Sequence, residues 1–178
     1  MNQDSKQQKS LFGQWLDDND DLIQFVGIAA AVFAVLQLIY YQFYLDSNLF
    51  HSYLVFCARM SSEVLLLIGE PVSVSFRVLM SPSGPKLIVV EGCDALRIFS
   101  VLVAVIIAFD TRWSAKAWGL MLGLSIMFVL NIFRISGLLW VDVHHTDLFD
   151  LFHHTIFPLA LWAAAVTYFF LWGKFVTQ

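Results

Sequence analysis

Charged residues are scarce in this chain of 178 residues, making up 13% of it. Ordinary soluble domains carry about a quarter. Hydrophobic residues make up 59% of the chain, more than a soluble domain of this size can hide from water. The net charge of −4 leaves no basic surface of the kind that binds nucleic acid. This composition predicts an integral membrane protein.

Cysteine is also rare, with only Cys57 and Cys93 in the whole sequence and no CxxC motif. Two thiols cannot form the framework of a disulfide-rich scaffold. A membrane thiol redox protein that pairs Cys57 with Cys93 is one alternative. Such proteins usually carry closely spaced cysteine pairs, which this chain does not have.

What the sequence has in abundance is long apolar runs. A membrane span needs roughly 20 residues. The second run is shorter than this, so its helix must begin near Glu91 in order to cross the bilayer. Tyr and Trp cluster at the run ends, as in the aromatic belts of membrane proteins. We therefore expect an all-α integral membrane protein with about four transmembrane helices, at residues 22–44, 95–109, 118–140 and 154–172.

The segment 45–92 departs from this pattern. Residues 48–69 are apolar but contain Arg59 and Glu63, which are four positions apart and share a face of a helix. This predicts an amphipathic helix on the membrane surface, and a fifth spanning helix is the alternative. Residues 72–91 contain two β-prone runs around the turn sequence SPSGP, which predicts a small β-hairpin.

Basic residues in the short loops predict the orientation. Arg112 and Lys116 lie between the second and third runs, whereas the loop 141–153 has neither Lys nor Arg. By the positive-inside rule, both termini face the cytoplasm and the hairpin and Cys93 lie outside. The expected organisation is a cytoplasmic tail (1–21) and a single membrane-embedded domain (22–178), with an extracytoplasmic helix and hairpin (45–92) and the candidate catalytic helices (93–172).

Three of the predicted spans each bring a reactive side chain to the outer face. Cys93 precedes the second span, and a helix N-terminus favours a thiolate, although a small buried residue is an equally ordinary role. Arg134 lies inside the third span, where an arginine costs at least ~2.5 kcal/mol and usually faces a functional interior. Asn131 is one turn deeper on the same face. The alternative for Arg134 is a structural role, snorkelling or pairing with Asp142.

His153 and His154 stand at the outer end of the fourth span, and each taken alone is more often structural than catalytic. Their meeting with Cys93 and Arg134 at one face changes this interpretation. A thiol nucleophile, a base and a cation for the oxyanion are the groups that acyl transfer needs. Asn131 could orient the arginine.

Three stretches carry a resemblance to a known family: EGCDA (Glu91–Ala95), NIFRISGLL (Asn131–Leu139) and FHHTIFP (Phe152–Pro158). Their order and spacing resemble the signatures of the exosortase/archaeosortase family of membrane cysteine transpeptidases, most like the compact Bacteroidetes exosortases. The more widespread family pattern has a small polar residue and then Gly after the cysteine, where this chain has Asp94 and Ala95.

The resemblance implies that Cys93, Arg134 and a histidine are catalytic. His154 is preferred because Pro158 stands four residues on, where the family often has Gly, and His153 is the runner-up. The implied activity is cleavage of the C-terminal sorting signal of exported proteins at the outer face, followed by transfer to an acceptor through a thioacyl-enzyme intermediate.

The implied partners are an exported substrate with a C-terminal transmembrane tail and the lipid bilayer, with no nucleic acid. The implied location is the bacterial inner membrane, with the active site facing the periplasm. Ligation of this kind needs no metal or organic cofactor, and we expect none.

Two other functions are compatible with the sequence. One is metal binding by the outer loop, although its spacings match no firm ligand motif. Another is a non-enzymatic membrane partner protein in which Arg134 binds an acidic residue of another transmembrane helix. The loop residues that could bind a metal are Asp142, His144, His145, Asp147, Asp150, His153 and His154.

Overall fold

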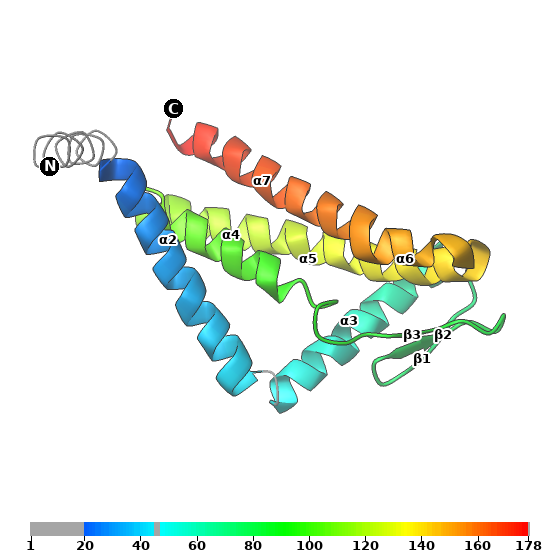
Figure 1. Cartoon of the computed structure of the whole chain (residues 1–178). Helices are drawn as coiled ribbons and strands as arrows, with labels where there is room; N and C mark the ends of the chain where they lie inside the picture. The colour runs from blue at the N-terminus through cyan, green and yellow to red at the C-terminus, as the bar shows by residue number, and fades with distance from the viewer. Residues whose placement is uncertain (1–19, 45–46, 178) are drawn as a thin grey trace, which may run out of the picture.

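The computed structural model describes residues 20–44 and 47–177, so the predicted tail over residues 1–21 lies almost entirely outside the described residues. Helices and one small sheet make up the described chain (Figure 1). The elements η1 and η3 are π-helical turns, and η2 is a 3-10 turn. In chain order, the helices, turns and strands of the described chain are α2 (Asp20–Ile39), η1 (Tyr40–Tyr44), α3 (Asn48–Leu67), β1 (Ser73–Ser75), β2 (Val78–Met80), β3 (Lys86–Ile88), α4 (Leu96–Ala108), α5 (Trp113–His144), η2 (Thr146–Leu148), α6 (Phe149–Leu151), η3 (Phe152–Ile156) and α7 (Phe157–Val176).

Three helical stretches in the described chain are long and apolar enough to cross a membrane. They confirm the predicted fold class, an all-α membrane protein with a small sheet. Pro158 stands in the first turn of α7, directly after the π-helical turn η3. The three stretches are Asp20–Gln42, Trp113–His144 and Thr146–Val176.

The remaining apolar helix, α4, has 13 residues and a length of about 20 Å, short of the ~30 Å hydrocarbon core. It nevertheless packs against α2 (Figure 1). Asp94 contacts Tyr40 at one end of the pair. At the other end Asp110 lines the same cavity as Asp21. We therefore treat α4 as crossing the same layer as α2.

The expected start of the second span near Glu91 is wrong, because α4 begins at Leu96. Gly92 has a φ of 86° and Ala95 a φ of 57°, both in the left-handed region, which does not continue a right-handed helix. Residues 91–95 therefore form a loop. Cys93 lies in this loop, two residues before the helix, rather than in its first turn.

The helix α3 is the predicted amphipathic element. One side of it is buried against the second half of α5, where the Ser136 hydroxyl donates to the carbonyl of Ser61 at 3.1 Å. Arg59 and Glu63 are exposed on the other side. With 20 residues α3 is long enough for a span, but it is not apolar enough to count among the candidate spans of the described chain.

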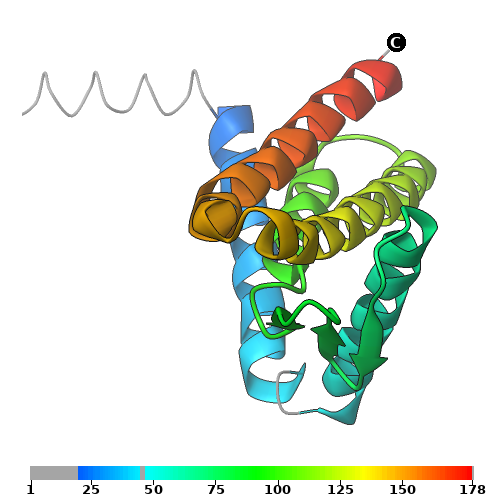
Figure 2. The ribbon, with the colours of Figure 1, turned by 90° about the vertical axis from the view of Figure 1, so that its right-hand side faces the viewer.

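The predicted hairpin is a sheet of three antiparallel strands in the order β1-β2-β3. The first β-prone run is divided by a tight turn at Phe76 and Arg77, where Phe76 has a φ of 53°. Ser73 pairs with Met80 and Val78 pairs with Ile88. The sheet contacts α3 and α5, and β3 leads directly into the Cys93 loop (Figure 2).

Candidate active site

The loop before α4 carries the candidate nucleophile. Gly92 precedes it in a left-handed conformation that suits glycine, and this turns the chain back toward α5. The backbone N–H of Cys93 donates to the carbonyl of Val90 at 3.0 Å. The Cys93 side chain is 7% exposed, so the thiol lies just below the protein surface rather than on it.

Three successive carbonyl groups of this loop each accept a hydrogen bond from a different side chain. Arg134 Nη1 donates to Gly92 O at 3.2 Å, and Asn131 Nδ2 donates to Cys93 O at 2.9 Å. The Tyr53 hydroxyl donates to the backbone oxygen of Asp94 at 2.9 Å. Two helices remote in sequence, α3 and α5, therefore fix the backbone on both sides of the thiol. We call these three bonds the carbonyl clamp.

Two atoms of the clamp residues keep unused hydrogen-bonding capacity. Arg134 is 7% exposed and its Nε has no partner in the described part of the chain, and the same holds for Oδ1 of the fully buried Asn131. A buried unsatisfied polar group costs about 1–3 kcal/mol. Both unsatisfied atoms belong to residues that bond to the Cys93 loop.

The side chain of Asp94 is 2% exposed and fully engaged. Its Oδ2 accepts the Tyr40 hydroxyl at 2.8 Å, and its Oδ1 accepts the N–H of Leu96 at 3.2 Å. The second bond satisfies one of the free N–H groups at the start of α4, as a capping residue does. Asp94 thus joins the Cys93 loop to α2 as well.

Sequence reasoning did not identify Tyr40 or Tyr53 as site residues. Tyr40 was expected at the end of a span, where the aromatic belt accounts for it. Tyr53 lies in the amphipathic segment, one turn away from Cys57, with no motif around it. No local motif around either tyrosine pointed to the site.

The two histidines occupy the π-helical turn η3 and differ in their surroundings. His153 is half-buried, its ring centre is 5.4 Å from that of Phe149, and it lies within electrostatic range of Arg134. His154 is exposed, with its ring centre 4.5 Å from that of His153. Neither forms a hydrogen bond with another described side chain. The structure thus joins Asn131 to Cys93 and Arg134 to the neighbouring Gly92, and it places His153 within electrostatic range of Arg134.

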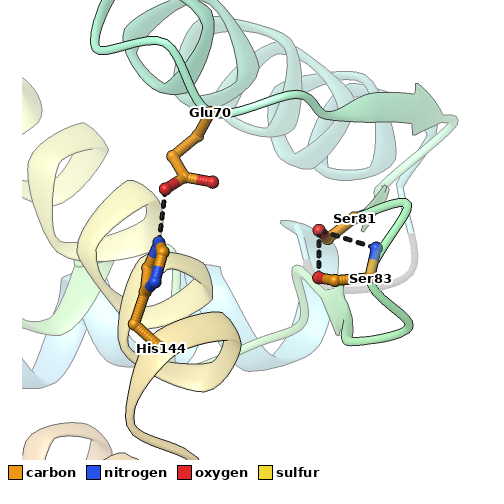
Figure 3. A network of polar contacts seen from close by, with 4 residues as sticks. All are labelled: Glu70, Ser81, Ser83 and His144. Carbon is orange, nitrogen blue, oxygen red and sulfur yellow. Dashed lines mark hydrogen bonds and ion pairs between the residues drawn. The ribbon is translucent and has the colours of Figure 1, made fainter.

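The acidic and histidine-rich residues of the segment 142–154 do not gather into one cluster. Within residues 20–44 and 47–177, no group of three or more His, Cys, Asp or Glu side chains could hold a metal ion. His144 instead contacts Glu70 and thereby ties the end of α5 to the segment before β1 (Figure 3). Ser81 and Ser83 form a separate contact in the turn between β2 and β3 (Figure 3).

Comparison with known proteins gives one family. The model of the family described as transmembrane exosortase (Exosortase_EpsH) matches residues 22–171, which include the Cys93 loop, α5 and both histidines. Searches of curated proteins and of solved structures gave no match. Since the matched region covers most of the 178 residues, the chain belongs to the transmembrane exosortase family.

Proposed function

We propose that this protein is a membrane-embedded cysteine transpeptidase that cleaves the C-terminal sorting signal of exported proteins and transfers them to an acceptor. Family membership supports a membrane transpeptidase-like role in general. The observation that carries the finer proposal is the carbonyl clamp. Arg134 and Asn131, both within a membrane helix, bond to the backbone carbonyls of Gly92 and Cys93 and so bring a guanidinium to the loop that carries the thiol.

In the proposed reaction the sulfur of Cys93 attacks the scissile carbonyl carbon of the substrate. A histidine takes the thiol proton and returns it to the amine as the C–N bond breaks, which leaves a thioester. The acceptor then gives its proton to the histidine, attacks the thioester and releases Cys93. Arg134 stabilises the oxyanion in both steps, and its unused Nε is a free donor for that purpose.

For the base, the geometry favours His153 over the expected His154. His153 is half-buried, is held against Phe149 and lies within range of Arg134, whereas His154 is exposed. A base works best where packing fixes its orientation and water is partly excluded. We therefore assign the proton transfers to His153, and His154 is the alternative.

The proposed location is the bacterial inner membrane, with both termini in the cytoplasm and the active site facing the periplasm. The start of α2 and the end of α7 lie on the same side of the molecule (Figure 1). The basic residues Arg112 and Lys116 lie in and just after the short connection between α4 and α5 on that side. The Cys93 loop contacts the far end of α2 through Tyr40, which supports the opposite side for the site.

The test is processing of a co-expressed exported protein with a transmembrane C-terminal tail, chosen from genes near this one. Cys93→Ala should abolish cleavage while the protein still inserts in the membrane. Cys57→Ala is the matched control, because it removes the other thiol of the chain, which has no exposed surface and takes no part in the carbonyl clamp. Cleavage that continues without Cys93 would refute the proposal and favour a binding role for Arg134.

A further inference from the structure

A buried carboxylate directly follows the candidate nucleophile. Asp94 is 2% exposed, and the ion pair found in the described residues joins His144 and Glu70 rather than Asp94 and a cation. A negative charge beside a thiol opposes formation of the thiolate. The enzyme must therefore compensate this charge with hydrogen bonds and direct it away from the sulfur.

Tyr40 supplies the main side-chain hydrogen bond to this carboxylate. Its hydroxyl lies 2.8 Å from Asp94 Oδ2, and the tyrosine is 8% exposed. Aromatic neighbours hold its ring, with the ring centre of Phe50 at 5.9 Å and that of Tyr41 at 5.0 Å. The hydroxyl therefore has little freedom to turn away from Asp94.

The backbone that presents Tyr40 is itself unusual. Tyr40 is the first residue of the π-helical turn η1, and π-helices account for well under 1% of residues in globular proteins and frequently occur at functional sites. The second π-helical turn, η3, carries His153 and His154. Both rare turns thus border the site that contains Cys93 and Arg134.

We propose that Tyr40 and Asp94 form a positioning pair that fixes the carboxylate beside Cys93 so that the thiolate can form. The Tyr40 hydroxyl and the N–H of Leu96 each bond to one carboxylate oxygen. Together they hold the turn before α4 and compensate the charge. The pair does not touch the substrate and acts through Cys93. The catalytic consequence rests on the proposed function, whereas the effect on the thiol does not.

Other titratable groups surround the pair and bear on its pH dependence. Two of them are basic: Arg97, which is exposed and donates to the Tyr41 hydroxyl, and Arg134 of the carbonyl clamp. Neither forms an ion pair with Asp94. The acidic and phenolic groups near the pair or in range of its charge are Tyr41, Tyr44, Tyr53, Cys57 and Glu91.

The test is the rate of iodoacetamide alkylation of Cys93 as a function of pH, measured on the purified full-length protein in detergent. Tyr40→Phe removes only the hydroxyl, so the pH of half-maximal rate should rise by about half a unit or more. Asp94→Asn removes the charge, so the same midpoint should fall. In the Asp94→Asn background, Tyr40→Phe should cause no further rise, because no charge remains to compensate.

Tyr44→Phe is the matched control, since Tyr44 lies on the same π-helical turn and its hydroxyl bonds to no described side chain. Its midpoint should equal that of the wild type. Cys57 reports folding in every variant, because this fully buried thiol should stay unlabelled in a folded protein.

Two results would overturn the proposal for a folded Tyr40→Phe protein. One is an unchanged midpoint. Another is an equal rise in the Asp94→Asn background, which would show that Tyr40 acts by some route other than the carboxylate. Because alkylation needs no substrate, failure of the transpeptidase proposal would appear separately, as cleavage that survives Cys93→Ala.

Discussion

The ring of Phe157 lies directly over Gly137, so that a Cβ at position 137 would be 2.7 Å from Phe157 Cζ. Gly137 belongs to α5, three residues after Arg134, and Phe157 begins α7, directly after the turn with the histidines. Two of the three sequence stretches that resemble exosortases thus meet at this contact. The missing side chain lets η3 approach Arg134.

Replacing Gly137 with valine should separate α7 from α5 and impair processing. The new side chain would overlap the Phe157 ring, and overpacking of this kind typically costs 1–3 kcal/mol. We expect a loss of cleavage with membrane insertion retained, measured on a co-expressed substrate. Gly27→Val in α2 is the control, because a Cβ there meets no atom within 4 Å. Equal processing by both variants would show that the contact does not position η3.

The histidines can be separated by one pair of variants. His153→Gln should stop cleavage, because glutamine cannot take the thiol proton, whereas His154→Gln should retain most of it because that side chain is exposed. The measurement is the rate of substrate processing with matched amounts of enzyme in the membrane. The reverse result would assign the base to His154, as the family resemblance alone predicts.

The two thiols should differ sharply in reactivity. Burial raises the pKa of Cys57 to about 11, and its side chain has no exposed surface, so at pH 8 almost no thiolate is present there. Native protein treated with iodoacetamide at pH 8 should therefore gain one label, at Cys93, and protein unfolded in detergent should gain two. Peptide mapping by mass spectrometry distinguishes the sites. Labelling of Cys57 in the native protein would contradict the described packing of α3.

The sequence predicted those parts of the fold that depend on composition. Long apolar runs and their flanking aromatics predicted the spans, since a bilayer demands about 20 apolar residues whatever the tertiary contacts. Within the candidate site, the sequence singled out Arg134 and Asn131, because placing charged and polar side chains inside a bilayer costs free energy. Both residues bond to the Cys93 loop.

The parts that depend on tertiary packing were not predicted. The start of α4 at Leu96 follows from two left-handed residues, and Ala95 has no propensity that announces such a conformation. The split of the first β-prone run at Phe76 has the same cause. Tyr40 and Tyr53 became site residues because α2 and α3 converge on one loop, and no local pattern in the sequence records that convergence.

Replacing Ala95 with glycine should stabilise the protein. Ala95 precedes α4 with a φ of 57°, a conformation that costs an alanine about 1–2 kcal/mol and that glycine adopts freely. Part of this gain is offset by the greater freedom of glycine in the unfolded chain, so we expect a net stabilisation of about 1 kcal/mol. The measurement is the thermal unfolding midpoint in detergent, which should rise.

The matched control is Ala104→Gly, in the middle of the same helix, where ordinary helical geometry should make glycine destabilising by about 1 kcal/mol. Opposite signs for the two substitutions would confirm the left-handed turn before α4. A lower midpoint for Ala95→Gly would mean that α4 begins earlier and that Cys93 lies in its first turn. Since the widespread family pattern has glycine at this position, the same variant should also retain processing.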